Sequence, residues 1–389
     1  MRVAMIGQKT NLLHIGGVET HVHYLTKELE RRGHEVVTFI RRQYGFDMVG
    51  RPPGAVVSRP CIRTKHFEAI THSSVCALDA GLRGFDVIHF HGVGPSLAIR
   101  LARVRRRPAV CVTIHDQDYN KDKWSRAARR MLRMGESSAV RRADGLIVVA
   151  RYLRNHIAET YGRVADYIPN GAESLTFRGP GETLSRFGLE PGRYVMFVGR
   201  LVPEKGCDNL IRALRASSTP YSLAVIGGAS HSDGYVEYLH ELAAGDPRVK
   251  FLDRQSGDPL AELRSNAAAY VMPSLQEGLP LAMLEALWFG LPVIATDIPA
   301  VHELDAETLA ERVTLVPPAN IESLRSALDE LPFPAARPNR PGSLVWPDWS
   351  DVAAQVESVY DRIARSSRTE PVGYESSGRR APAAPSGRL

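Results

Sequence analysis

Short apolar runs alternate with helical stretches along the first 170 residues of the chain. Five runs have the length and the Val and Ile content of buried strands: RVAMI, EVVTFI, DVIHFHG, AVCVTIHD and GLIVVA. Helical stretches separate them, including residues 18–32 and 121–142. Strands that alternate with helices predict a parallel sheet with helices on both of its faces. We therefore expect residues 1–170 to form a doubly wound, Rossmann-like α/β domain.

A second alternating set follows a segment rich in Gly and Pro. That segment, residues 171–193, is expected to be a linker. Residues 194–347 contain six further strand-like runs: YVMFVGR, SLAVIGG, VKFLD, AAYVMPS, LPVIAT and VTLV. We expect a second Rossmann-like domain here, with a cleft between the two domains. Residues 348–365 should form a last helix, and residues 366–389 have the composition of a disordered tail.

The overall composition is that of an ordinary globular protein. Of 389 residues, 44% are hydrophobic and 24% are charged. No apolar run approaches the roughly 20 residues that span a bilayer, and the first residues lack the apolar core of a signal peptide. The cysteines, Cys61, Cys76, Cys111 and Cys207, have no spacing typical of zinc sites or disulfide frameworks. We therefore expect a cytoplasmic protein.

Charge is divided unevenly between the two halves of the chain. Residues 1–170 hold 28 Lys and Arg against 15 Asp and Glu, a net charge of +13, and the remainder has a net charge of −7. A basic half suggests an anionic partner, such as a phosphate group or an anionic membrane surface. One face of the expected helix over residues 121–142 carries four arginines: Arg126, Arg129, Arg130 and Arg133. The opposite face carries Trp124, Ala128, Met131, Leu132 and Gly135.

Two interpretations of this helix remain open. Its arginines could dock on the inner face of the plasma membrane, together with the run RLARVRRR at residues 100–107. Alternatively, its apolar face packs on the sheet and the arginines are simply solvated.

Two glutamates stand in the otherwise apolar segment QEGLPLAMLEALWFGLPVIATD, at residues 276–297. Glu277 directly follows an expected strand, and Glu285 lies near the start of the expected helix. In parallel sheets, ligands bind outside the carboxyl ends of the strands. Both carboxylates can therefore face the cleft and bind a ligand that carries hydroxyl groups. The simpler alternative is that Glu285 is a solvated helix residue and Glu277 a loop residue.

Basic and glycine-rich loops follow the first strand of each domain. Arg200 and Lys205 in VGRLVPEKG suit a diphosphate, because Arg offers a planar fork and Lys a mobile charge. Gly7, Gly16 and Gly17 precede the first helix, whose free amides could bind an anion. Their spacing is not that of a dinucleotide fingerprint. Ordinary tight turns and solvated cations would produce the same patterns.

A histidine and two aspartates follow another strand of the first half. His115, Asp116 and Asp118 stand in TIHDQD, where a strand-end histidine and a helix-capping aspartate are the simplest interpretation. We expect His89 and His91 in HFHG to face opposite sides of their strand, and so we expect no metal site. The G-x-S-x-G elbow of serine hydrolases is absent.

Three motifs follow one another along the chain: GGVE after the first strand, GRLVPEKG at the start of the second domain, and EGLPLAMLEAL with its two glutamates eight positions apart. In this order they resemble those of the retaining glycosyltransferases of family 4. The resemblance covers about residues 1–365 and implies the two-domain GT-B fold. The segment from His115 to YIPNG is also similar to a bacterial subgroup that includes rhamnosyltransferases of surface-polysaccharide assembly.

The resemblance implies a role for four charged residues of the second half. Arg200 and Lys205 would hold the diphosphate of a nucleoside-diphosphate sugar, so that no metal and no other cofactor is needed. Glu285 would accept hydrogen bonds from the ribose, and Glu277 from the donor sugar. Arg200, Lys205, Glu277 and His115 would be the catalytic residues.

The remaining positions are implied by the same resemblance. Further donor contacts would come from Gly16, Gly17, Gly278 and Leu279. Acceptor-side residues would be His115, Asp116 and Asn170. Many family members have an aromatic–glycine pair where this chain has Leu279 and Pro280, which leaves the identity of the sugar open.

The implied reaction is front-face transfer of a hexosyl or deoxyhexosyl group, with retention of configuration. The acceptor would be a hydroxyl of a glycan, a lipid-linked molecule or a small molecule, with no role for nucleic acid. Three alternatives are a GT-B nucleotide-sugar epimerase, an NAD-dependent oxidoreductase and a non-enzymatic membrane scaffold. The order of the motifs disfavours the first, and the missing fingerprint disfavours the second.

Overall fold

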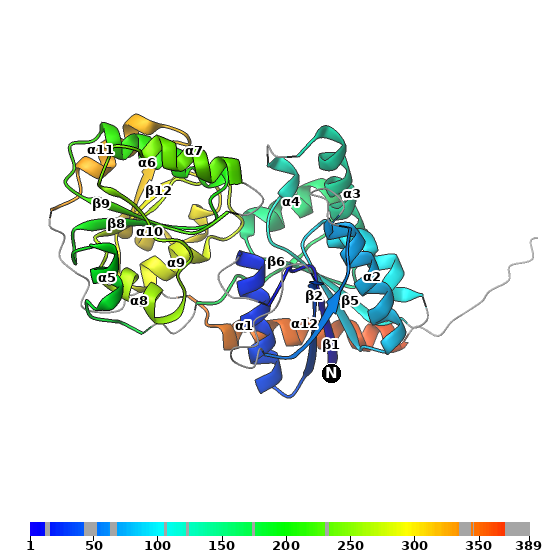
Figure 1. Cartoon of the computed structure of the whole chain (residues 1–389). Coiled ribbons are helices and arrows are strands. Elements are labelled where there is room, and N and C mark those ends of the chain that lie inside the picture. The colour runs from blue at the N-terminus through cyan, green and yellow to red at the C-terminus, as the bar shows by residue number, and fades with distance from the viewer. Residues whose placement is uncertain are drawn as a thin grey trace, which may run out of the picture.

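Two α/β domains make up the computed structural model of the chain, with the C-terminal helix beneath the first domain (Figure 1). The structure describes residues 1–11, 16–42, 53–62, 68–104, 107–121, 124–172, 176–229, 233–333, 344 and 346–369. Each domain is built on a parallel sheet with helices packed against it. The prediction of two doubly wound domains that face a cleft is confirmed.

The first domain contains a seven-stranded parallel sheet in the order β3-β2-β1-β4-β5-β6-β7. Its strands are β1 (Arg2–Ile6), β2 (Glu35–Arg41), β3 (Ala55–Arg59), β4 (Val87–His91), β5 (Ala109–Ile114), β6 (Gly145–Val148) and β7 (Asp166–Tyr167). Both faces of the sheet are buried, because Val3 and Met5 pack in one hydrophobic cluster while Ala4 and Ile6 pack in another. The edge strands β3 and β7 are at most partly buried and were not predicted.

The helices of the first domain connect these strands. They are α1 (Gly17–Arg31), α2 (Glu68–Arg83), α3 (Arg126–Arg142) and α4 (Arg151–Tyr161), with 3-10 turns η2 (Pro95–Arg103) and η3 (Asp118–Asn120). Helix α3 begins later than the predicted residue 121. Its N-cap is Ser125, whose hydroxyl accepts a hydrogen bond of 3.3 Å from the amide of Ala128.

The second domain contains a six-stranded parallel sheet in the order β10-β9-β8-β11-β12-β13. Its strands are β8 (Tyr194–Val198), β9 (Ser222–Ile226), β10 (Val249–Phe251), β11 (Ala269–Met272), β12 (Val293–Thr296) and β13 (Val313–Val316). Its longer helices are α6 (Cys207–Ala216), α7 (Asp233–Ala243), α8 (Gly257–Asn266), α9 (Leu281–Trp288), α10 (Ala306–Arg312) and α11 (Ile321–Asp329). The turns η4 (Pro203–Lys205) and η5 (Val301–Glu303) complete it. All six predicted strands are present.

The segment predicted as a linker contains a short helix, α5 (Glu182–Phe187). The carboxylate of Glu262 on α8 accepts hydrogen bonds of 2.8 Å from the amide of Gly181 and 3.0 Å from that of Leu184. A carboxylate at a helix N-terminus satisfies amides that have no partner within the helix. Helix α5 is therefore fixed on the second domain.

The last helix, α12 (Trp349–Thr369), packs against the first domain. It extends four residues beyond the predicted end at residue 365. Trp349 stacks on Tyr24 of α1 with a centroid distance of 5.5 Å. The hydroxyl of Tyr360 lies 2.7 Å from Nδ1 of His89 in β4. The rest of the predicted tail, residues 370–389, lies outside the described residues.

Within the ranges that the structure describes, no helix combines the length and the apolar character needed to cross a membrane.

Candidate active site

A cleft of about 650 Å³ lies between the two domains. Because all strands within each sheet are parallel, the loops at their carboxyl ends meet at this cleft. Every site residue expected from the sequence lines its walls: Gly16, Gly17, His115, Asp116, Asn170, Arg200, Lys205, Glu277, Gly278, Leu279 and Glu285. The structure therefore brings together positions that are widely separated in the chain.

The loop after β8 supplies Arg200 and Lys205. Gly206 ends this loop with a φ of +64°, and a Cβ added there would lie 2.1 Å from the carbonyl oxygen of Pro273. Only glycine fits this position, which fixes the course of the loop. The ammonium of Lys205 pairs with Glu277, whereas the guanidinium of Arg200 has no ion-pair partner among the described residues. An anion that enters the cleft can thus bind Arg200 without breaking an existing pair.

Glu277 is held by contacts from both domains. Its carboxylate accepts a hydrogen bond of 2.7 Å from the hydroxyl of Ser274 and contacts Lys205. Its backbone carbonyl accepts a hydrogen bond of 2.9 Å from the hydroxyl of Tyr152, which belongs to α4 of the first domain. The residue expected to bind the sugar and the lysine expected to bind the diphosphate are therefore in contact in the free protein.

Glu285 lies on α9 and forms an ion pair with Arg264 of α8. The side chains are only 12% and 4% exposed, respectively. Burial raises the pKa of Glu285, and the positive charge of Arg264 opposes this shift. Sequence analysis missed Arg264, because a single arginine in a helical stretch is ordinarily solvated. No local signal in the sequence distinguishes it from such a solvated arginine.

The first domain contributes two lysines that sequence analysis also missed. Lys121 lies 2.9 Å from the carboxylate of Asp116, which also accepts a hydrogen bond of 2.8 Å from the amide of Gln276 in the second domain. Lys9 lines the cleft, and burial lowers its pKa to about 8, with Arg41 and Arg200 nearby. The cleft is therefore lined by more cations than the sequence motifs indicated.

The two domains approach each other closely at Gly278. A Cβ at this position would lie 1.7 Å from the carbonyl oxygen of His115. No side chain fits in this space, so the glycine brings the loop before α9 directly against the end of β5.

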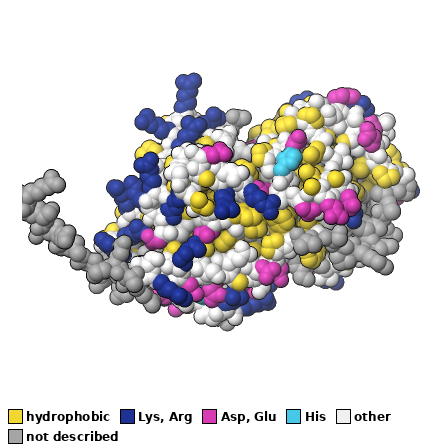
Figure 2. All heavy atoms as spheres, turned by 180° about the vertical axis from the view of Figure 1, so that it is seen from behind, with side chains coloured by type: hydrophobic (Ala, Val, Ile, Leu, Met, Phe, Trp, Pro, Cys, Tyr) yellow, Lys and Arg dark blue, Asp and Glu magenta, His cyan; other side chains and the backbone are white. Residues whose placement is uncertain are grey.

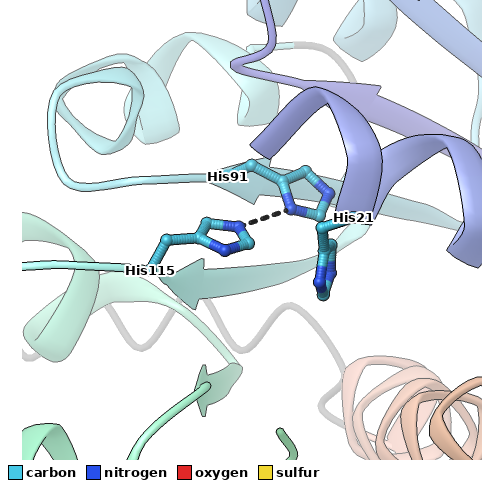
Figure 3. Close-up of side chains that lie close together, drawn as sticks. All are labelled: His21, His91 and His115. Atoms are coloured by element: carbon cyan, nitrogen blue, oxygen red, sulfur yellow. Dashed lines mark hydrogen bonds between the residues drawn. The ribbon is translucent and has the colours of Figure 1, made fainter. Parts of the chain in front are cut away.

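Three histidines gather at the first-domain wall (Figure 3). Nδ1 of His91 lies 3.2 Å from Nε2 of His115, and the ring of His21 from α1 is 4.7 Å from that of His115. Nδ1 of His21 lies 2.8 Å from Oδ1 of Asn170. Burial lowers the pKa of His21 to about 4 and those of His91 and His115 well below their usual range. All three rings are therefore neutral at neutral pH.

The prediction that His89 and His91 face opposite sides of their strand is wrong. Their rings lie only 4.2 Å apart, and both are fully buried. The physical reason is the period of two in a strand: residues i and i+2 point to the same face. That orientation brings His91 beside His115, where a histidine cluster forms.

Replacing Arg264 with Met should destabilise the protein by about 3–5 kcal/mol at neutral pH, since Glu285 would be left buried without a counter-charge. Protonation relieves this cost, because the folded-state pKa of Glu285 would then lie further above its unfolded value. The loss should therefore be present at about pH 7.5 and smaller at about pH 5, near the usual pKa of Glu. Chemical denaturation at both pH values measures it.

The double variant Arg264→Met/Glu285→Met serves as the matched control, because it removes both charges at once. It should recover most of the lost stability. If Arg264→Met is as stable as the wild type at both pH values, Glu285 does not need the charge of Arg264 for the stability of the fold.

Both domains match sequence families of glycosyltransferases. Residues 15–174 match the family model described as Glycosyltransferase Family 4, and residues 192–331 match Glycosyl transferases group 1. The alpha-maltose-1-phosphate synthase of Mycobacterium tuberculosis (strain ATCC 25618 / H37Rv) is 27% identical over 331 residues, 79% of this chain and 82% of that protein. The D-inositol 3-phosphate glycosyltransferase of Acidothermus cellulolyticus is 30% identical over 342 residues, 76% of this chain and 75% of that protein.

Solved structures share the same arrangement of two domains. Sucrose-phosphate synthase from Thermosynechococcus elongatus superposes with a TM-score of 0.71 at 21% identity, covering 94% of this chain and 96% of that one. HepE of Anabaena, solved with UDP and glucose, gives a TM-score of 0.70 at 18% identity, covering 94% and 99%. At these identities the structures support the fold, and the sequence relatives support the family. The chain therefore belongs to glycosyltransferase family 4 and has the GT-B fold.

Proposed function

We propose that the protein is a retaining glycosyltransferase that moves a hexosyl or deoxyhexosyl group from a nucleoside-diphosphate sugar to a hydroxyl group of its acceptor. The observation that carries this proposal is the placement of Arg200, Lys205, Glu277 and Glu285 on the walls of one cleft. Cations suit a diphosphate and carboxylates suit the hydroxyls of two sugars. HepE of Anabaena, which shares the fold, has been solved with UDP-glucose.

The diphosphate would lie against Arg200 and Lys205. When the bond between the anomeric carbon and the phosphate oxygen breaks, negative charge grows on the diphosphate, and fixed cations stabilise it. Arg200 is available in the free protein, whereas Lys205 must exchange Glu277 for phosphate. That exchange would free the carboxylate of Glu277 to accept hydrogen bonds from the sugar. Donor binding and sugar recognition would thereby be coupled through one ion pair.

The nucleoside would be anchored by Glu285. The positive charge of Arg264 favours the ionised form of this buried carboxylate, and an ionised carboxylate accepts strong hydrogen bonds from ribose hydroxyls. Gly16, Gly17, Gly278 and Leu279 would form the close walls around the phosphate and the sugar.

The acceptor would enter from the side of the first domain, near His115, Asp116 and Asn170. In front-face transfer, the acceptor oxygen bonds to the anomeric carbon on the side from which the phosphate departs. Bond formation on that same side retains the configuration, and the proton of the acceptor hydroxyl passes to an oxygen of the leaving phosphate. The cations of the cleft would provide the stabilisation for which other enzymes use a metal ion.

The acceptor is proposed to be a glycan, a lipid-linked sugar or a small molecule. The segment from His115 to YIPNG resembles rhamnosyltransferases of surface-polysaccharide assembly, which favours a polysaccharide acceptor and a deoxyhexose donor. The protein would act on the cytoplasmic side of the membrane.

A panel of nucleotide sugars tests the proposed function directly. The purified protein should release nucleoside diphosphate slowly from one donor without an acceptor, and faster with the right acceptor. Nuclear magnetic resonance of the product should show an unchanged anomeric configuration. An epimerised free sugar would instead indicate an epimerase. If no donor releases nucleoside diphosphate, the protein is a non-enzymatic binding protein.

Replacing Glu285 with Gln should weaken binding of the nucleoside diphosphate by about tenfold or more, because hydrogen bonds to a charged acceptor are lost. Gln is chosen because it can still accept a hydrogen bond from Arg264, whereas Ala would leave that arginine buried and alone. Calorimetry measures the affinity, with Glu322→Gln on the surface of α11 as the control. Equal affinities in both variants would exclude Glu285 as the ribose anchor.

Replacing Arg200 or Lys205 with Ala should lower kcat by roughly 100-fold, a loss of about 2.7 kcal/mol of transition-state stabilisation. The free energy of unfolding should change little in Arg200→Ala, because that side chain is partly exposed, whereas Lys205→Ala also leaves the carboxylate of Glu277 without its ion-pair partner. Steady-state kinetics with and without EDTA make the comparison. Wild-type turnover in both variants, or strict dependence on a divalent ion, would show that Arg200 and Lys205 do not bind the diphosphate.

We also propose that the first domain docks on an anionic membrane surface. Lys and Arg side chains gather on the half of the surface that the first domain forms (Figure 2). In α3, Ala128, Leu132 and Gly135 are buried, as expected for the apolar face. Arg126, Arg130 and Arg133 are exposed, whereas the guanidinium of Arg129 is directed to the carbonyl oxygen of Lys121. Three arginines, rather than four, are therefore exposed, although the guanidinium of Arg133 also lies over the ring of Tyr119 at 5.3 Å.

Liposome co-sedimentation tests this surface. Each exposed arginine can contribute about 1 kcal/mol near an anionic leaflet, so binding should be measurable and should weaken as salt rises. Replacing Arg126, Arg130 and Arg133 with Gln should abolish most of it, while Arg129→Gln is the matched control. Equal recovery with neutral and anionic lipid would indicate an enzyme that does not use the membrane.

A further inference from the structure

The histidine cluster at the cleft is assembled from three separate elements. His21 comes from α1, His91 ends β4, and His115 follows β5 (Figure 3). One ring nitrogen of each lies within 4.8 Å of one ring nitrogen of the other two. His91 and His115 also line the cleft, whereas His21 is buried and does not line it. The reaction proposed above uses only His115 of the three.

The orientation of His21 is fixed by Asn170. Oδ1 of Asn170 can only accept a hydrogen bond, so Nδ1 of His21 must carry the proton across the 2.8 Å between them. Nε2 of His21 then presents a lone pair. This atom is buried and has no hydrogen-bond partner among the described residues. A buried acceptor without a partner is costly and needs an explanation.

His91 is oriented in a similar way. Its Nε2 lies 3.4 Å from the thioether sulfur of Met5, a weak acceptor, so this nitrogen carries the proton. Nδ1 of His91 therefore presents its lone pair to Nε2 of His115 at 3.2 Å. In the free protein, Nε2 of His115 donates its proton to that lone pair. If the proton moves to the other nitrogen of His115, the ring stays neutral and a third lone pair becomes available.

Three neutral imidazoles with convergent lone pairs form a typical ligand set for a transition metal. A ligating histidine usually donates its second ring nitrogen to a carbonyl or carboxylate oxygen, as His21 does to Asn170. Tetrahedral Zn²⁺ with Zn–N bonds of about 2.0–2.1 Å needs ligand nitrogens about 3.3 Å apart. The ring nitrogens of His91 and His115 already have this spacing. The ring nitrogen of His21 lies within 4.8 Å of each of them and would move closer to both when the ion binds.

We infer that His21, His91 and His115 bind one divalent transition-metal ion, such as Zn²⁺, and that this ion inhibits the enzyme. Nitrogen ligands alone favour Zn²⁺, Co²⁺, Ni²⁺ and Cu²⁺ over Mg²⁺ and Ca²⁺, which prefer oxygen. The fourth coordination position would face the cleft. A bound ion would hold the ring of His115 away from the sugar and the acceptor. The site would thus be regulatory and separate from the metal-independent transfer reaction.

A titration with Co²⁺ and Zn²⁺ tests the site without any activity measurement. The full chain, purified without a histidine tag, should bind about one equivalent of Co²⁺ with the visible absorption of tetrahedral cobalt, and Zn²⁺ should displace it. Mg²⁺ should not bind. His21→Gln and His115→Gln should each weaken Co²⁺ binding at least about tenfold. His302→Gln is the matched control, because His302 is half exposed and pairs with Asp297 at 2.6 Å.

Circular dichroism of each variant shows whether it is folded, and the use of two variants keeps the test valid if one is not. Absence of binding to the wild type, or wild-type affinity in both cluster variants, would overturn the proposal. Inhibition is then tested on donor hydrolysis: Zn²⁺ should inhibit the wild type, EDTA should restore activity, and His21→Gln should need at least about tenfold more Zn²⁺. Binding without inhibition would overturn the inhibitory role alone, and a protein inactive on every donor would leave the titration unaffected.

Discussion

All strands in each of the two sheets run parallel to their neighbours, and the cleft depends on this constraint. In a parallel sheet every connecting loop after a strand emerges at the same edge. The side chains that follow β5, β8 and β11 are therefore concentrated in one place, although they are far apart in the chain. Gly278 then allows the loop before α9 to touch the end of β5 directly. The direction of the strands determines where charge can accumulate, and one glycine determines how closely the two edges meet.

Charges in the cleft are mostly paired before any ligand is present. Lys205 pairs with Glu277, Arg264 with Glu285, and Lys121 with Asp116. Pairing allows charged groups to be partly buried without a large desolvation cost. An anion that binds Lys205 would have to replace Glu277, and under the proposed function the hydroxyls of the sugar would then bind the freed carboxylate. The arrangement would thereby favour a molecule that carries both phosphate and hydroxyl groups.

Much of the fold and of the cleft could be predicted, because the responsible signals are local. Runs of Val and Ile gave the central strands, and the glutamates and basic loop follow those strands directly. Arg264 could not be predicted, since its partner lies 21 residues away on another helix. The packing of α12 on the first domain is likewise a tertiary contact without a local signal. The histidine cluster was missed for a different reason, an incorrect count of the strand period at His89 and His91.

The contact between α12 and the first domain has a consequence for biosynthesis. Val352, Val356 and Tyr360 complete the hydrophobic cluster that also contains Val3 and Met5 of the first strand. These residues leave the ribosome only after both sheets have been synthesised. The first domain therefore cannot bury all of this face when its own strands have been made: α1 can cover part of it, but the part under α12 stays open until the second domain has been synthesised. That part of the apolar face of the first sheet remains available to chaperones throughout that interval.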